Sequence, residues 1–229
     1  LYRPHWAPTA PEGLAFHEFK GVYHASFGDF YAGQVKVPVG WEGIQNPKDL
    51  WLPRSFLYEK GLIPLYDTGA GFSSSYRGFY MNLLVHQGEG AGVSNTDDRI
   101  FVTGQWGVNG PARSNMGLSL STGRYLDGTG KENRVRSGTA YFGFNILGLG
   151  LQVDATYMRV IDPVKHVDKF VWHGDLQHPI TDNIYLIARY EQYTPDTEKS
   201  ADGESRIYAG GEIRSKNEVS RLFVFYVKN

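Results

Sequence analysis

Apolar and polar residues alternate along most of this chain, and the alternation restarts about every twenty positions from Phe16 to Val227. In one run, Met81, Leu83 and Val85 alternate with Asn82 and His86. Because successive side chains of a strand point to opposite faces, a period of two predicts β-strands. No long stretch has a helical period. The chain is therefore predicted to be all-β, and its strands must close into a barrel or stack into a sandwich.

Turn residues divide the sequence into strands of the length that a tilted membrane strand needs, about 9 to 11 residues. The predicted strands are residues 15–27, 30–40, 68–76, 78–87, 99–108, 116–125, 135–146, 149–160, 169–179, 183–194, 205–214 and 219–228. Short and long connections alternate, so one end of the structure is expected to carry tight turns and the other long loops. This asymmetry is typical of antiparallel outer-membrane barrels. Both ends of the strand series fall on the loop side, so we expect an incomplete barrel, completion by another segment or chain, or an unusual topology.

The composition supports one barrel domain over residues 1–229, with residues 1–13 as an N-terminal extension. Gly 28, Tyr 15, Phe 13 and Trp 5 suit curved strands and interfacial aromatic girdles. Lys+Arg 23 against Asp+Glu 24 gives a net charge of -1, so no nucleic-acid partner is expected. The first residues do not resemble a signal peptide, which we expect to have been removed by processing.

The direction of the apolar face separates a membrane barrel from a soluble one. A closed barrel of about twelve strands encloses more space than side chains from one face can fill, which favours a polar lumen and an apolar exterior. Valines such as Val35 and Val37 are then predicted to face lipid, with Gln34 and Lys36 inside. The predicted lipid-interface aromatics are Tyr23, Trp41, Trp106, Tyr125, Trp172, Tyr190 and Tyr208. A soluble barrel or sandwich that binds a ligand remains the alternative.

Charged residues of both signs lie on the predicted lumen face. They are Lys20, Lys36, His86, Asp154, Lys169, His173, Asp175, Arg189, Glu191, Arg206, Glu212 and Arg214. They are expected either to neutralise one another across neighbouring strands or to filter small polar or ionic solutes. The long loop 41–67 is unusually apolar, so it is expected to pack into the lumen as a constriction or onto a partner.

One segment resembles a known family. Gly33-Gln34-Val35-Lys36-Val37-Pro38-Val39-Gly40-Trp41-Glu42 is followed by the long loop from Ser55 to Gly69 and by a strand pair that ends at Val85-His86-Gln87-Gly88. This order is similar to the phosphate-selective porins (O/P type) of Gram-negative outer membranes. The resemblance implies a porin-like transmembrane β-barrel, and by analogy a homotrimer or larger membrane complex. Lys60 stands where the family pattern has Arg, and no cluster of basic residues forms an anion ladder, so phosphate selectivity is not implied.

The sequence therefore predicts a passive diffusion pore for small polar, ionic or anionic solutes, in contact with membrane lipid and lipopolysaccharide. A non-conducting structural barrel in an outer-membrane assembly is the alternative. We expect no enzyme, no catalytic residue, no cofactor and no metal site, because Cys is 0 and no Ser has an evident His partner. On a strand, His173 and Asp175 share a face that His178 does not. Acidic loop residues at Asp97-Asp98 and Asp202-Gly203-Glu204 could hold Ca²⁺, but are more often solvated.

Overall fold

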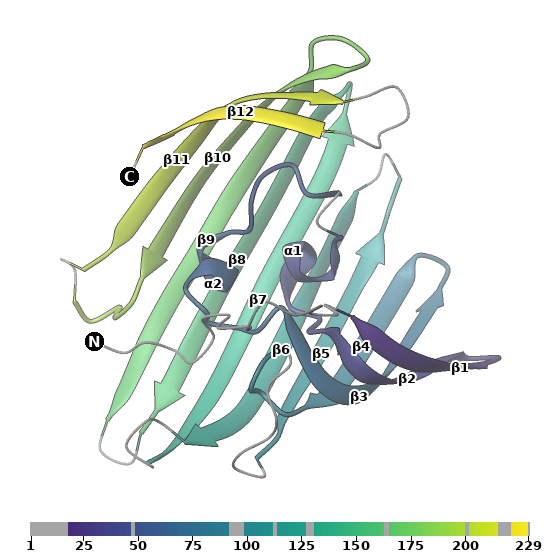
Figure 1. Ribbon diagram of the computed structural model, residues 1–229, viewed down its shortest axis with the longest axis vertical. Helices are drawn as coiled ribbons and strands as arrows, with labels where there is room; N and C mark the ends of the chain where they lie inside the picture. Colours follow the sequence, from purple (N-terminus) through teal and green to yellow (C-terminus); the bar gives the residue numbers. More distant parts are fainter. Residues whose placement is uncertain are drawn as a thin grey trace.

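The computed structural model describes residues 18–46, 49–91, 99–111, 114–126, 131–162, 165–199, 202–214 and 221–228. Its twelve strands form one antiparallel sheet in sequence order (Figure 1). They are β1 (Phe19–Ala25), β2 (Gly28–Lys36), β3 (Tyr66–Tyr76), β4 (Phe79–His86), β5 (Phe101–Asn109), β6 (Asn115–Leu126), β7 (Glu132–Ile146), β8 (Leu149–Ile161), β9 (His166–Pro179), β10 (Ile184–Thr194), β11 (Glu204–Arg214) and β12 (Arg221–Lys228). All twelve predicted strands are present, with ends shifted by a few residues. The predicted extension, residues 1–13, lies outside the described residues.

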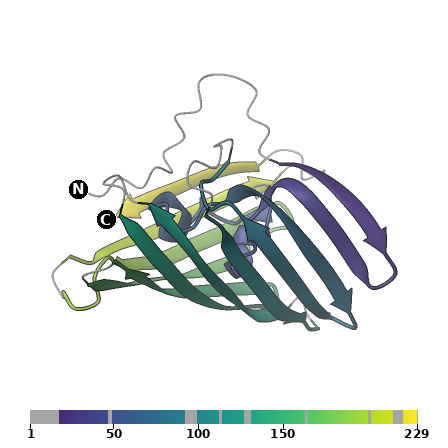
Figure 2. The same ribbon diagram turned by 90° about the horizontal axis from the view of Figure 1, so that it is seen from below.

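The sheet curls around a central space, as Figure 2 shows from below. Each strand pairs with its neighbours in the sequence; among the described residues β1 pairs with β2 and β12 with β11, so these two are the edges of the sheet. β1 begins and β12 ends at the end of the sheet that carries the long connections, as predicted. The barrel fold of antiparallel strands is confirmed.

Tight turns join the strands at the opposite end. The β3–β4 turn places Arg77 at φ 50 and Gly78 at φ 88, and the β7–β8 turn places Leu147 at φ 52 and Gly148 at φ 83. Two consecutive residues with positive φ match the twist of a two-residue hairpin. The predicted asymmetry between tight turns and long loops is therefore confirmed.

Large apolar side chains are exposed on the outer face of the curled sheet. Trp106, Leu118, Leu120, Phe142 and Leu176 are each at least 40% exposed. The inner-face residues between them, such as those of β7 and β8, are mostly buried or polar. This distribution is the reverse of that in a water-soluble barrel and fits a lipid-facing exterior. Among the described residues, no helix has the length and apolar character to cross a membrane.

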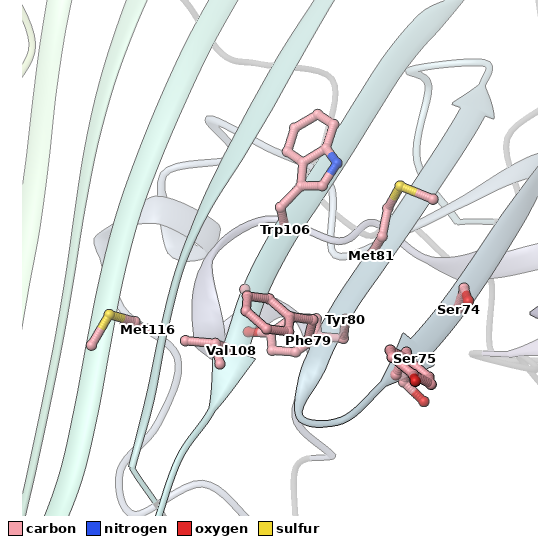
Figure 3. Close-up of a pocket in the computed structure, with 10 residues that line it drawn as sticks. Ser74, Ser75, Phe79, Tyr80, Met81, Trp106, Val108 and Met116 are labelled. Atoms are coloured by element: carbon pink, nitrogen blue, oxygen red, sulfur yellow. The ribbon is translucent and has the colours of Figure 1, made fainter.

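A shallow groove opens near the tight turns of β3 to β6. Its volume is about 480 Å³ (Figure 3). It is lined by Ser74, Ser75, Tyr76, Phe79, Tyr80, Met81, Trp106, Gly107, Val108 and Met116. Most of these side chains are apolar, so the groove continues the lipid-facing character of the exterior.

The predicted facing of β2 is wrong. Val35 and Val37 are almost fully buried inside the curled sheet. Gln34 and Lys36, predicted for the lumen, therefore lie on the outward parity of β2, since alternate residues point to opposite faces. The physical reason is that an apolar segment fills the interior beside β2. The valine side chains are therefore more stable packed against this segment than facing lipid.

Candidate functional site

The described residues between β2 and β3, residues 37–46 and 49–65, fold into the space that the sheet encloses. We call them the inward segment. They contain two short helices, α1 (Gly40–Ile44) and α2 (Phe56–Glu59), of which α1 contacts β6, β7 and β8, and α2 contacts β9 and β10 (Figures 1 and 2). The segment therefore lies against the inner wall.

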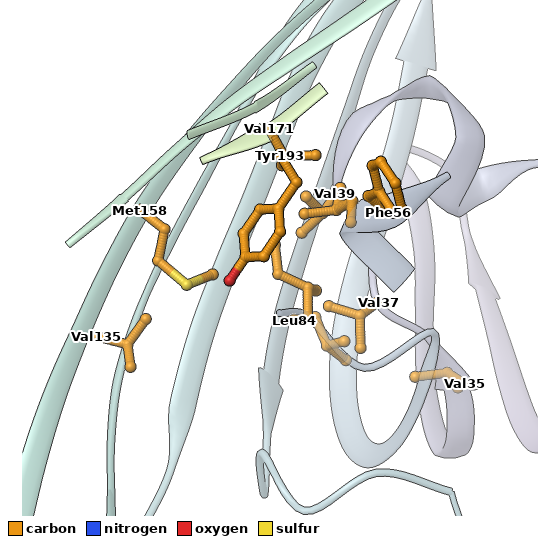
Figure 4. Close-up of a cluster of buried hydrophobic side chains, with 11 residues drawn as sticks. Val35, Val37, Val39, Phe56, Leu84, Val135, Met158, Val171 and Tyr193 are labelled. Carbon is orange, nitrogen blue, oxygen red and sulfur yellow. The ribbon is translucent and has the colours of Figure 1, made fainter. Parts of the chain in front are cut away.

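An apolar cluster joins the inward segment to the wall (Figure 4). The segment contributes Val37, Val39, Phe56, Leu57 and Ile63, and the strands contribute Val35, Leu84, Val135, Met158, Val171 and Tyr193. A second, smaller cluster packs Leu52 against Ile187 and Tyr208. Burying these side chains together stabilises the folded-in position of the segment, because apolar surface leaves water.

Polar contacts fix the start of α1 on the wall. The N–H groups of Trp41 and Glu42 donate to one carboxylate oxygen of Asp154, at 3.1 and 3.2 Å. The N–H of Gly40 donates to Ser119 Oγ at 3.0 Å, and the side-chain amide of Gln105 donates to the Gly40 carbonyl at 2.8 Å. The first N–H groups of a helix have no partner inside the helix, so wall residues satisfy them here.

Gly40 is expected to be essential to this contact. Its φ is +63, and an added Cβ would lie 2.7 Å from the Asp154 carboxylate. Gly40→Ala should destabilise the docked segment by about 1–3 kcal/mol, because the residue is strained and the carboxylate has to move. Amide hydrogen exchange at Trp41 and Glu42 should accelerate accordingly. Gly21→Ala, whose Cβ has no atom within 4 Å, serves as the control and should leave exchange at both amides unchanged.

Arg189 connects the inward segment with β9 and β10. Its guanidinium binds both carboxylate oxygens of Asp175, at 2.6 and 2.7 Å, and donates to Glu42 Oε1 at 3.2 Å. It also donates to the carbonyl of Pro53 at 2.5 Å. Arg189, Asp175 and Glu42 are all nearly inaccessible to solvent. One buried cation thus holds two parts of the segment against the wall.

A second ion cluster lies beside α2. Glu191 accepts from the Phe56 N–H at 2.9 Å and from Arg206 Nε at 2.6 Å, and Arg206 also donates to Glu59 at 2.6 Å. Phe56 N–H belongs to the first turn of α2, where a carboxylate is favourable. At the rim, Lys60 pairs with Glu204 at 2.6 Å, where both side chains are partly exposed.

Glu42 is ionised in this setting. Burial alone would raise its pKa, but the positive charge of Arg189, the electrostatic interaction with His173 and the hydrogen bonds from Ser55 outweigh burial, so the pKa of Glu42 is lowered from its ordinary value of 4.5. Ser55 supplies both its N–H and its hydroxyl, the latter at 2.6 Å. The carboxylate therefore links α1, the start of α2 and the wall.

Most of the predicted lumen charges do face the interior. His86 contacts Asp67 and Thr103, and Arg214 binds Glu212 at 2.7 and 2.9 Å. The structure places Asp154, His173, Asp175, Arg189, Glu191, Arg206 and half-buried Lys169 on the same inner face. The ion pairs on this face join Arg189 to Asp175 and Glu42, and Glu191 to Arg206.

Two predicted lumen lysines lie outside the buried ion clusters, and one of them, Lys36, faces outward. Lys36 belongs to the outward parity of β2, and its ammonium reaches the carbonyl of Gln45 at 3.1 Å and Asn46 Oδ1 at 2.7 Å. Lys20 lies opposite Gly33, on the inward parity of the edge strand β1, where it is exposed and pairs with Glu18 at 2.7 Å. Neither belongs to the buried ion clusters, because β1 and the end of β2 lie at the margin of the sheet.

The predicted interface aromatics divide into two groups. Tyr23, Trp106, Trp172 and Tyr190 lie on the outer face, where Trp172 and Tyr190 are in ring contact at 5.2 Å. Three predictions are wrong. Trp41 stacks on Tyr141 inside the sheet, Tyr125 packs against the apolar cluster, and Tyr208 packs with Leu52. These rings face inward because the segment gives the interior an apolar surface that an empty polar lumen would lack.

Sequence reasoning missed several residues of this site, including Glu42, Asp67, Gln105 and Ser119. A possible signal was the single acidic residue in the otherwise apolar stretch from Val37 to Ile44. Within the described ranges, no group of three or more His, Asp or Glu side chains could hold a metal ion. His173 Nε2 and Asp154 Oδ1, on directly opposite positions of β9 and β8, find no hydrogen-bond partner among the described residues.

Known proteins share the fold without close sequence similarity. "Outer-membrane expressed OmpT of Vibrio cholerae" superposes with a TM-score of 0.72 at 10% identity, covering 91% of this chain and 69% of that chain. The loop L8 deletion mutant of OmpT, an outer membrane protein of Vibrio cholerae, gives a TM-score of 0.70 at 11% identity, with coverages of 91% and 72%. No family model matches, and no curated protein sequence matches.

These matches confirm the β-barrel fold that outer-membrane proteins adopt, and the apolar exterior fits the predicted outer-membrane location. They do not single out the phosphate-selective porins. The prediction that the chain is not an enzyme must also be corrected. Both matched structures are OmpT proteins. A shared fold at 10–11% identity does not support the expectation that this chain has no enzymatic activity. That exclusion is therefore withdrawn.

Proposed function

We propose that this outer-membrane barrel is a porin-like pore whose width is set by the inward segment. The observation that carries the proposal is the docking of the inward segment on the inner wall through both an apolar cluster and buried ion pairs. A segment held so firmly inside the sheet narrows the space that solutes can cross. The resemblance of residues 33–42 and 55–69 to phosphate-selective porins supports the same function.

The solutes in this proposal are small and polar or ionic. The inner-face charges are largely paired with one another: Arg189 with Asp175, Arg206 with Glu191, and Arg214 with Glu212. Paired charges of both signs discriminate less between cations and anions than a ring of charges of one sign would. Selection is then expected to depend mainly on size.

Planar-bilayer recording tests the pore directly. Purified protein should produce discrete conductance steps, and the steps should decrease when neutral polymers small enough to enter the pore are added. Because the inner charges are paired, the ratio of cation to anion permeability should stay within about tenfold. Folded protein, shown by heat-modifiable migration, that inserts without any conductance would contradict the pore.

A non-conducting structural barrel is the second candidate, and the apolar cluster favours it. A wall-to-segment contact this extensive could close the lumen as well as narrow it. The homotrimer implied by the porin resemblance belongs to either function. Native mass spectrometry in detergent gives the subunit number, and a monomer would remove the trimer from the proposal.

A further inference from the structure

Four arginines lie together on the outer face of the sheet, at the end with the long connections. They are Arg124 on β6, Arg134 and Arg136 on β7, and Arg159 on β8, and we call them the arginine row. Directly opposite residues of paired strands point to the same face, and Arg124 lies opposite Arg134 while Arg136 lies opposite Arg159. All four are exposed.

The arginine row borders the apolar exterior on the side of the long connections. The next outward positions toward the tight turns are Leu120, Gly138, Tyr157 and Phe170, which are opposite one another on β6 to β9. Outward residues of β7 from Gly138 to Ile146 carry no charge. This stretch extends about 26 Å along the strand, or about 20 Å of membrane height after tilting, close to the apolar band of such barrels. The arginines therefore lie at the level of lipid headgroups.

Acidic residues neutralise this surface incompletely. On the outward face of the described parts of β6 to β9, the acidic side chains are Glu132 and Asp168. Asp168 binds Arg159 through two hydrogen bonds of 2.7 Å, and Glu132 lies 3.3 Å from Arg124. Glu132 is shared with Arg99, at 3.1 Å.

Arg134 and Arg136 differ from the other two arginines. Among the described residues, neither forms an ion pair or a hydrogen bond with a protein group. A guanidinium at the edge of a hydrocarbon layer is stabilised by an anion that it can bind through two parallel hydrogen bonds, and phosphate is such an anion. Charge and position thus point to the same kind of ligand.

We propose that the arginine row binds the phosphate groups of a phosphorylated, acylated glycolipid of the outer leaflet, of the lipid A type found in lipopolysaccharide. The long loops of such barrels lie on the extracellular side, which places the row in that leaflet. Acyl chains then lie along Leu120, Tyr157 and Phe170, just below the guanidinium groups. The site is separate from the pore, because its side chains point away from the lumen.

Native mass spectrometry of the detergent-solubilised protein tests this site with bisphosphorylated lipid A as the probe. The wild type should bind bisphosphorylated lipid A more tightly than its dephosphorylated form. The double variant Arg134→Gln with Arg136→Gln should weaken binding about tenfold or more. Arg77→Gln is the matched control, because Arg77 is an exposed arginine in a tight turn at the opposite end, and it should leave the affinity unchanged.

Three results would overturn the proposal. The first is equal affinity of the double variant and the wild type for bisphosphorylated lipid A. The second is full competition by inorganic phosphate at the same concentration, which would indicate a free-phosphate site. The third is a loss of subunit association in the double variant with lipid binding intact, which would make the row an interface between copies. Conductance should be unchanged in the double variant, so failure of this site and failure of the pore are distinguishable.

Discussion

Arg189→Met should release the inward segment from the wall and raise the single-channel conductance. The substitution removes the cation and leaves Asp175 and Glu42 as buried carboxylates without their main partner. Breaking a buried pair in this way costs about 3–5 kcal/mol. A cost of about 3 kcal/mol shifts the equilibrium between docked and undocked segment by about 100-fold. Planar-bilayer recordings should therefore show larger steps and frequent transitions between conductance levels.

Lys60→Met is the matched control for Arg189→Met. Lys60 also ties the inward segment to the wall, through Glu204, but both side chains of this pair are partly exposed. An exposed pair contributes about 0–1 kcal/mol, so the control should leave conductance near the wild-type value. Heat-modifiable migration shows whether each variant has folded. A folded Arg189→Met protein with wild-type conductance would show that Arg189 does not hold the segment in place.

Acid should loosen the same segment through Glu42. The folded-state pKa of Glu42 is lowered, so its ionised form stabilises docking above its ordinary value of 4.5, and this stabilisation is lost as the pH falls through the lower folded-state pKa. Arg189, His173, Ser55 and the nearby Asp154 are the groups that influence this carboxylate. We expect the conductance of the wild type to rise as the pH falls below 4.5 and through the lower folded-state pKa of Glu42.

Glu42→Gln separates this effect from other titrating groups. The variant should conduct at pH 7 as the wild type does in acid, and most of the change in conductance below pH 4.5 should disappear. Glu204→Gln, which removes the exposed partner of Lys60, should keep the full acid response. If the conductance of Glu42→Gln still rises in acid, the rise belongs to another carboxylate. This result would contradict the proposed role of Glu42.

Strand positions could be read from the sequence because alternation depends on local geometry. Runs such as Phe142 to Ile146 and Leu149 to Val153 have one face in lipid and one face inside, so period and facing agree. On β2 the alternation correctly predicted a strand, but the predicted direction of its apolar side chains was wrong. Val35 meets the apolar inward segment, a contact between residues distant in the sequence that no local pattern records.

The site was predictable only in part for the same reason. Arg189 and Asp175 share the polar face of neighbouring strands, so their proximity followed from the alternation. Glu42 lies outside any alternating run, and its contact with Arg189 joins residues 147 positions apart. Aromatic residues such as Trp41 are suited both to membrane interfaces and to packed interiors, and composition does not distinguish the two.

Single cysteines on β6 test the central claim, that the exterior faces lipid and the interior faces water. The chain has no cysteine of its own, so each introduced thiol reports one position. Leu120 is exposed on the outer face, and its neighbour Ser121 is half-buried on the inner face. In lipid vesicles, Ser121→Cys should react with a water-soluble thiol reagent, whereas Leu120→Cys should be protected and should instead be accessible to a lipid-soluble quencher. Equal reaction of both thiols with the water-soluble reagent would contradict the account.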